Sequence, residues 1–163
     1  MLKIQPVNDT YSEAVIDLIL NIQQEEFNIQ ITIDDQPDLL HINNFYLSNG
    51  GNFWGAFINN QLVGTIALVK FDKKSAAIRK MFVKKDFRGK EHDIAQKLLK
   101  TLIFYCNENG IEQIYLGTVS VLKAALRFYE KNHFIIVEKE FLPEKFPLME
   151  TDNVFCFLNL KSK

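Results

Sequence analysis

The sequence has few cysteines, no long apolar run and no recognisable leader. Its 163 residues include two cysteines, and neither Cys106 nor Cys156 has the spacing of a metal ligand or the setting of a nucleophile. We therefore expect two buried free thiols and no metal site. No apolar run approaches the ~20 residues that a membrane crossing needs, and the first ten residues lack the apolar stretch of a signal peptide. We expect a cytoplasmic protein without a membrane partner.

A strong net charge is also absent. The formal net charge is -1, which argues against a general nucleic-acid binder, because such proteins usually carry a marked positive excess. Locally, however, residues 79–100 contain eight basic and three acidic residues, so this segment attracts anions. A nucleic-acid-associated protein that uses this cluster is one functional class to consider. It predicts an affinity that falls steeply with salt and strong retention on heparin.

The hydrophobic content of the chain is that of a folded domain. Hydrophobic residues make up 47% of the chain and include 14 phenylalanines, enough to fill a core. Because the chain has no repeat, no low-complexity tract and no linker rich in proline, glycine or serine, we expect a single domain over residues 1–163.

Hydrophobic periodicity predicts strands and helices in alternation. Strands are expected at 2–7, in two runs within 52–71, and at 76–85, 111–119, 134–141 and 153–160. The two runs within 52–71 are joined at Asn59-Asn60, a pair typical of a tight hairpin. Helices are expected at 11–25, 37–47, 93–109 and 121–132, and Gly110 should end the third of them as its C′ residue. This order predicts a mixed α/β sheet of about six to seven strands, mostly antiparallel and twisted, flanked by about four helices.

The segment FRGKEHDIAQ, Phe87 to Gln96, joins a strand to the longest predicted helix. The first turn of a helix has unpaired backbone N–H groups and the positive end of the helix dipole, so a loop at this place can hold an anion. Arg88 and Lys90 add positive charge, and Gly89 permits a tight backbone path. An ordinary surface turn before a helix is the alternative for this motif by itself.

Three motifs in the same order resemble the GNAT superfamily of N-acetyltransferases over nearly the whole chain. KEHDIA, Lys90 to Ala95, is similar to the family's Q/R-x-x-G-x-G/A loop and is followed by the expected apolar pair Leu98-Leu99. RKMFVKKDFRGK resembles the strand and the Arg-Gly turn before that loop, with the turn displaced by two residues. RFYEKNHF, Arg127 to Phe134, is similar to the family's Y-E-K-x-G-F ending of the fourth helix.

The resemblance implies a GNAT-like fold and direct transfer of acetyl from acetyl-CoA to an amine in a ternary complex. The main chain of the strand would pair with the pantetheine arm and polarise the thioester, and the loop amides would hold the pyrophosphate. Tyr129 would be the acid for the departing thiolate, and packing in the core is its alternative role. The implied partners are acetyl-CoA and an amine acceptor, with a homodimer left open. The residues implied in binding acetyl-CoA are Met81, Phe82, Val83, Arg88, Gly89, Lys90, Glu91, His92, Asp93, Ile94, Ala95 and Gln96.

Three positions depart from the family pattern. Asp93 and His133 stand where glycine is usual, and Asp and His are among the non-glycine residues best tolerated at positive φ. Leu122 replaces an asparagine that often helps to hold the pantetheine. Asp93 leaves two alternatives open. Its carboxylate either caps the helix in a D-x-x-Q capping box with Gln96 and occupies the amides, or it points outward and leaves anion binding to the longer loop.

The base that would deprotonate the amine is not identified by any motif. Glu25, Glu26, Asp34 and Asp35 are candidates because they lie in the first helix and the following loop, although a solvated surface is the alternative for all four. His41 and His92 are not expected to be catalytic. An aromatic group could line the acceptor pocket or belong to the core, namely Phe45, Tyr46, Phe53 and Trp54. The sequence therefore favours an active acetyltransferase, with a weak or inactive acyl-CoA-binding or regulatory module as the alternative.

Overall fold

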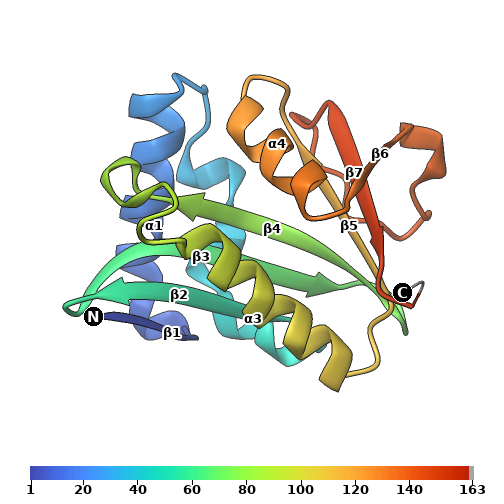
Figure 1. Cartoon of the computed structure of the whole chain (residues 1–163), viewed down its shortest axis with the longest axis horizontal. Coiled ribbons are helices and arrows are strands. Elements are labelled where there is room, and N and C mark those ends of the chain that lie inside the picture. The colour runs from blue at the N-terminus through green and yellow to red at the C-terminus, as the bar shows by residue number, and fades with distance from the viewer. Residues whose placement is uncertain (162–163) are drawn as a thin grey trace.

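The computed structural model describes residues 1–161, which form a seven-stranded sheet and four α-helices (Figure 1). The strands are β1 (Leu2–Pro6), β2 (Asn52–Ile58), β3 (Gln61–Lys70), β4 (Ser75–Val83), β5 (Gln113–Thr118), β6 (Ile135–Val137) and β7 (Val154–Asn159). The helices are α1 (Ser12–Leu20), α2 (Ile42–Phe45), α3 (Ile94–Glu108) and α4 (Lys123–Lys131). In the order β1-β2-β3-β4-β5-β7-β6, every described pair is antiparallel except β4 with β5. The predicted fold class is confirmed.

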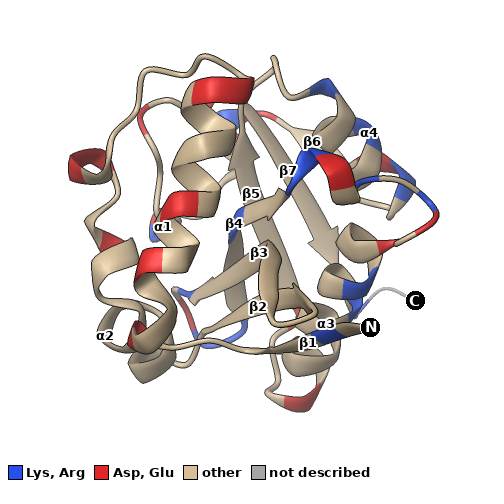
Figure 2. Ribbon diagram, turned by 90° about the vertical axis from the view of Figure 1, so that its left-hand side faces the viewer, with Lys and Arg blue, Asp and Glu red and all other residues tan. Residues whose placement is uncertain are grey.

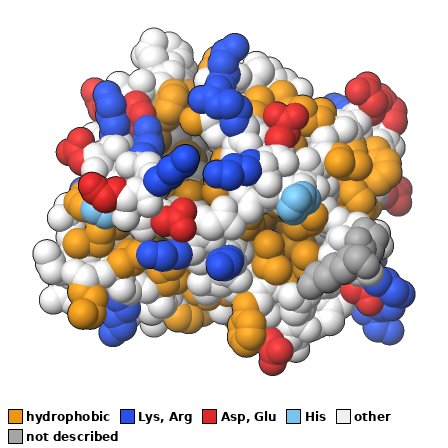
Figure 3. All heavy atoms as spheres, in the orientation of Figure 1, with side chains coloured by type: hydrophobic (Ala, Val, Ile, Leu, Met, Phe, Trp, Pro, Cys, Tyr) orange, Lys and Arg blue, Asp and Glu red, His pale blue; other side chains and the backbone are white. Residues whose placement is uncertain are grey.

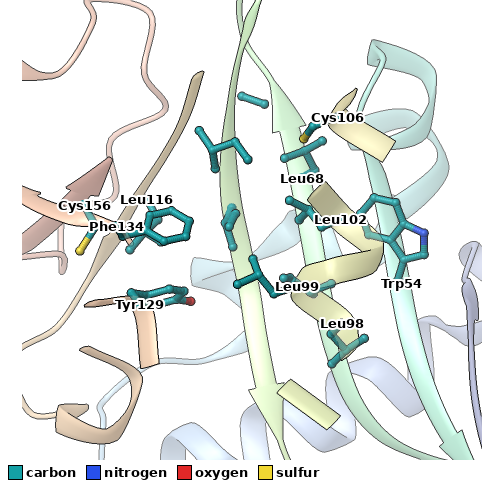
Figure 4. Close-up of a cluster of buried hydrophobic side chains, with 14 of the residues drawn as sticks. Trp54, Leu68, Leu98, Leu99, Leu102, Cys106, Leu116, Tyr129, Phe134 and Cys156 are labelled. Carbon is teal, nitrogen blue, oxygen red and sulfur yellow. The ribbon is translucent and has the colours of Figure 1, made fainter. Parts of the chain in front are cut away.

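Hydrophobic side chains on the two faces of the sheet form separate cores. Helices α1 and α2 contribute Val15, Leu18, Ile19 and Ile42 to one core. Helix α3 contributes one continuous apolar stripe to the other core: Ile94, Leu98, Leu99, Leu102 and Cys106. Figure 4 shows the last four of these side chains against the sheet. Both cysteines are buried free thiols, as predicted. Across residues 1–161, none of the helices combines the length and the apolarity that a membrane crossing requires.

Two local predictions about chain reversals are confirmed. Asn59 and Asn60 have φ values of 50° and 66°, the left-handed geometry that a tight β2–β3 hairpin requires. Gly110 has φ 73° after the end of α3, and the Ile111 amide donates to the Cys106 carbonyl at 2.9 Å. This bond satisfies one of the carbonyls that a helix end leaves unpaired.

Three predicted elements differ from the structure. The helix expected at 37–47 is a succession of short turns around α2, because His41 has φ −137° and ψ 52°, which lie outside the helical region and interrupt it. The helix expected at 11–25 leaves α geometry after Leu20 and continues as a π-helical turn. The strand expected at 134–141 is limited to β6, since a 3₁₀ turn then packs Phe141 against the sheet.

A bulge in β4 opens the centre of the sheet. Strands β4 and β5 pair over Ser75–Ile78 and Gln113–Leu116. The pairing of β3 with β4 then becomes irregular at Lys80, which has φ 56° and whose carbonyl accepts from Thr65 Oγ1 at 2.7 Å. A bulge bends its strand and redirects side chains. Within the described residues, Arg79–Val83 therefore has no partner strand on the side of β5.

Candidate active site

Two cavities meet where β4 and β5 separate in the described part of the chain. The larger, which we call the α3 cleft, has a volume of about 510 Å³ and lies between the 87–96 loop and α4. The smaller, which we call the inner pocket, has a volume of about 140 Å³ and lies between β4, β5 and the loop before β7. The residues that line both cavities are Met81, Phe82, Leu122, Ala125 and Tyr129. A group bound in one cavity would therefore reach the other at these residues.

The α3 cleft combines an apolar floor with a positive rim. Figure 3 shows the hollow surrounded by several basic side chains. Arg88, Lys90, Lys123 and Lys131 line the cleft, and Asp93 is the acidic residue that lines it within residues 1–161. The ribbon in Figure 2 shows acidic residues along α1, whereas several basic residues lie on and near α4. A rim of this charge attracts anions.

The first turn of α3 presents free backbone donors to this rim. The amides of Ile94, Ala95 and Gln96 have no hydrogen-bond acceptor within residues 1–161. The preceding Asp93 amide donates to the Gly89 carbonyl at 3.0 Å, which closes the loop onto the start of the helix. Free amides and the positive end of the dipole make this end of α3 suitable for a phosphate.

The structure decides between the two alternatives for Asp93. Asp93 is exposed, has φ 54° and makes no side-chain cap, while Gln96 Nε2 donates to Asn132 Oδ1 at 2.8 Å instead of reaching back to residue 93. The capping box is therefore wrong, and the carboxylate leaves the amides of the first turn free. His133 has φ 74°, so both substitutions of a family glycine adopt the positive φ that we predicted.

Most residues predicted to bind acetyl-CoA lie along the α3 cleft. Glu91 and His92 are the exceptions, because the His92 ring packs against Phe87 with a centroid distance of 5.6 Å and Glu91 faces solvent. The predicted residues that line the cleft are Met81, Phe82, Val83, Arg88, Gly89, Lys90, Asp93, Ile94, Ala95, Gln96 and Tyr129.

Arg88 is held by a carboxylate and a carbonyl. Its guanidinium forms a bidentate ion pair with Glu26, in which one Nη lies 2.7 Å from Oε1. Its Nε donates to the Val83 carbonyl at 2.8 Å. The hydrogen bond from Arg88 is the main reason that the pKa of Glu26 lies below its ordinary value. A carboxylate in such a pair is a poor proton acceptor, and Arg88 fastens the end of β4 to the segment after α1.

Tyr129 has a buried ring and an unpaired phenol. The side chain is 4% exposed, and its ring packs on Phe128 and Phe134 at centroid distances of 5.7 and 5.4 Å. Within residues 1–161 its hydroxyl has no hydrogen-bond partner, although the residue lines both cavities. Burial, and to a smaller extent the Cys156 thiol, raises the pKa of Tyr129 well above its ordinary value, so the phenol keeps its proton at neutral pH.

The candidate bases and the aromatic group do not line either cavity of the described chain, which agrees with the alternatives given for them, the surface and the core. Within residues 1–161, neither cavity is lined by Glu25, Glu26, Asp34 or Asp35. Asp35 instead accepts from the Thr32 amide at 2.9 Å. The predicted aromatic residues lie in the cores or, in the case of Phe45, under the guanidinium of Arg79 at 5.6 Å.

Sequence reasoning missed the charged groups of the inner pocket. Asp152 lines it, and burial raises the pKa of this carboxyl to about 6, against the opposing effects of Arg79 and Lys80. Lys80 lines it too, and burial lowers the pKa of its ammonium to about 8, although Asp38 acts in the opposite direction. Asp152 lies in a loop without periodicity, so no pattern could have found it.

Comparison with known proteins identifies the family. Residues 16–134 match the model of the Acetyltransferase (GNAT) family. The chain therefore belongs to the GNAT family of acetyltransferases. Its structure is similar to the crystal structure of a GNAT-family acetyltransferase from Staphylococcus aureus Mu50, with 43% identity, a TM-score of 0.95, and coverage of 99% of this chain and 100% of that one.

More distant relatives share the fold or part of the sequence. The PaiA N-acetyltransferase of Thermoplasma acidophilum, solved in complex with coenzyme A, has 18% identity and a TM-score of 0.76, with coverage of 98% of this chain and 99% of that one. The N-acetylaspartate synthetase of Danio rerio is 33% identical over 99 residues, which are 60% of this chain and 34% of the synthetase. The chain spans between about a third and a half of the length of the curated relatives that it matches.

Proposed function

We propose that this protein transfers an acetyl group from acetyl-CoA to the primary amine of a small molecule or a protein, by direct attack in a ternary complex. The observation that carries the proposal is the unpaired, protonated phenol of Tyr129 at the junction of the two cavities. The relatives support it, since they include N-acetyltransferases and a protein solved with coenzyme A.

The residues of the α3 cleft suit acetyl-CoA. The free amides of Ile94, Ala95 and Gln96, together with Lys90, would hold the diphosphate. The exposed edge of Arg79–Val83 would offer main-chain groups to the pantetheine, whose apolar parts would lie on the floor of the cleft. Bound acetyl-CoA would supply an activated thioester.

Tyr129 and Asp152 would donate and accept the protons that the reaction requires. During transfer a bond forms between the amine nitrogen and the acetyl carbon, the bond from that carbon to sulfur breaks, one proton leaves the nitrogen, and the sulfur gains one. Tyr129 holds a proton at its phenol oxygen and would give it to the departing sulfur. Because Asp152 is the carboxylate that lines the inner pocket within residues 1–161, it is the group placed to take the proton from the amine.

A weak or inactive acyl-CoA-binding module is the second candidate. It is favoured by Leu122, which lines both cavities and offers no side-chain hydrogen bond, and by the negative charge of Asp93 on the rim. In this case acetyl-CoA would bind without being consumed.

Calorimetry and a thiol-release assay separate the two candidates. We expect acetyl-CoA and desulfo-CoA to bind and to raise the melting temperature, because a ligand that binds only the folded state stabilises it. We also expect thiol release from acetyl-CoA with at least one member of a panel of primary amines. Binding without release for every amine would favour the module, and no binding would contradict both candidates.

Removing the charge of Asp93 should strengthen coenzyme A binding. We expect Asp93→Gly and Asp93→Asn each to lower the dissociation constant by about 3- to 10-fold, the effect of an exposed charge near the diphosphate. Asp93→Gly should also raise the free energy of unfolding by about 1 kcal/mol, because glycine adopts φ 54° without strain. Asparagine is the matched control that keeps the side chain and lacks the charge. Equal dissociation constants in all three proteins would show that the carboxylate does not oppose binding.

A further inference from the structure

The charges of the inner pocket indicate the kind of amine that it accepts, an inference that rests on the proposed function. The charged side chains that line the pocket within residues 1–161 are Arg79, Lys80 and Asp152. The charge of Lys80 is balanced by Asp38, since its Nζ lies 3.7 Å from Asp38 Oδ2. The same Nζ donates to Gln36 Oε1 at 2.6 Å. Arg79 and Asp152 are therefore the charges available to a ligand.

Arg79 has a guanidinium without an ionic partner in the described part of the chain. One Nη donates to the Met149 sulfur at 3.0 Å, and the group lies over the Phe45 ring at 5.6 Å from its centroid. A thioether is a weak hydrogen-bond acceptor, and the phenylalanine ring offers no lone pair. Most of the five N–H donors of the guanidinium therefore have no hydrogen-bond acceptor in the described part of the chain. The planar fork matches a carboxylate through two parallel hydrogen bonds.

Asp152 carries the complementary negative charge. Its carboxylate lies against the backbone of Gly117 so closely that a Cβ at that glycine would be 2.4 Å from Oδ2. The positive charge of Arg79 acts to lower the pKa of Asp152, yet no nitrogen and oxygen of the two come within the 4 Å of an ion pair. The pocket thus holds a positive and a negative group that are separated from each other.

We propose that the inner pocket binds a small amine that also carries a carboxylate, with the carboxylate on Arg79 and the ammonium on Asp152. Such a zwitterion bridges the two separated charges and leaves neither unpaired. A volume of about 140 Å³ suits an amino acid rather than a large metabolite. Tyr129 and Ala125 line both this pocket and the α3 cleft, so an amine bound in the pocket would lie next to the acetyl donor.

The test compares pairs of amines that differ in the carboxylate alone. Each α-, β- or γ-amino acid is assayed by thiol release from acetyl-CoA beside the amine that lacks its carboxylate, for example β-alanine beside ethylamine, and a lysine-containing peptide is included. We expect kcat/KM for the best amino acid to exceed that for its partner amine by at least about 10-fold, the effect of one charge-assisted pair. Equal values, or a preference for the peptide lysine, would overturn the inference and leave the transferase function intact.

Variants assign the effect to each charge. Arg79→Gln should reduce the ratio of the two kcat/KM values to about 1 with unchanged coenzyme A affinity, and Arg79→Lys, which keeps the charge and more of the packing, should reduce it partly. Arg127→Gln, the same change of charge at an exposed residue outside both cavities, should leave the ratio unchanged. Asp152→Asn should slow both amines of a pair. An Arg79→Gln protein that keeps the full ratio of the two kcat/KM values would overturn the inference. Failure of the unaltered protein to bind coenzyme A would instead contradict the proposed function and, with it, the inference.

Discussion

Replacing Tyr129 with phenylalanine is expected to lower kcat for acetyl transfer by about 100-fold or more, the usual contribution of a positioned proton donor. The phenylalanine ring would keep the contacts with Phe128 and Phe134, so the walls of both cavities should be unchanged. The dissociation constant of acetyl-CoA should therefore stay within about 2-fold of the unaltered value. Steady-state kinetics with a saturating amine, combined with calorimetry, would measure both quantities.

Tyr105→Phe is the matched control for this experiment. Tyr105 lies on α3, lines neither cavity, and donates its hydroxyl to the Gly50 carbonyl at 2.9 Å. Removing that hydrogen bond should cost about 1 kcal/mol of stability without changing kcat. Tyr129→Phe with normal kcat would show that the Tyr129 phenol does not supply the proton.

Replacing Lys80 with methionine is expected to destabilise the fold by about 3 to 5 kcal/mol, because it leaves the buried Asp38 carboxylate and the Gln36 oxygen without the amine that contacts both, a partner that even an uncharged lysine supplies. The side chains of Lys80 and Asp38 are 6% and 5% exposed. The same network includes the Tyr46 hydroxyl, which donates to Asp38, and Gln36, which donates to Gln23 Oε1 at 2.8 Å. Lys80 therefore connects the bulge of β4 to the segments that follow α1, and urea unfolding would measure the loss.

Two controls separate the buried charge from other causes. Lys80→Met combined with Asp38→Asn should recover about 2 kcal/mol relative to Lys80→Met, because asparagine can still accept from Tyr46 and carries no charge. Lys74→Met breaks a pair at 3.9 Å in which the lysine is 60% exposed, and should change stability by less than about 1 kcal/mol. A double variant no more stable than the single one would show that the charge of Asp38 is not the cause.

The lowered pKa of Lys80 gives the stability a defined pH dependence. Lys80 has a pKa of about 8 in the folded state, against an ordinary value of 10.5. Between these values the unfolded chain binds one more proton than the folded chain, so the contribution of Lys80 to the free energy of unfolding rises with pH. The difference in unfolding free energy between the unaltered protein and Lys80→Met should therefore increase above about pH 8. A constant difference would show that Lys80 does not titrate in this range.

The local patterns of the sequence were sufficient for the order of elements. Period-2 and period-3.6 apolar spacing identified the seven strands and the helices α1, α3 and α4, because an element that buries one face repeats its apolar residues at that spacing. Residue chemistry was sufficient for the turns at Asn59-Asn60 and Gly110 and for the positive φ of Asp93, since few residues adopt these dihedral angles. The family motifs are also short segments of neighbouring residues, and they identified many of the residues that line the α3 cleft.

The tertiary structure decided what local patterns cannot encode. Glu26 was a candidate base by its position in the chain, but its partner Arg88 comes from the loop after β4, 62 residues away in sequence. Asp152 and Arg79 line the same inner pocket because the loop before β7 folds over the gap between β4 and β5. The sequence by itself determined the sheet, its main helices and the loop that leads into α3, since these depend on neighbours along the chain. The ion pairs, the inner pocket and the charges left free for a ligand depend on which distant residues meet, and only the packed fold determines that.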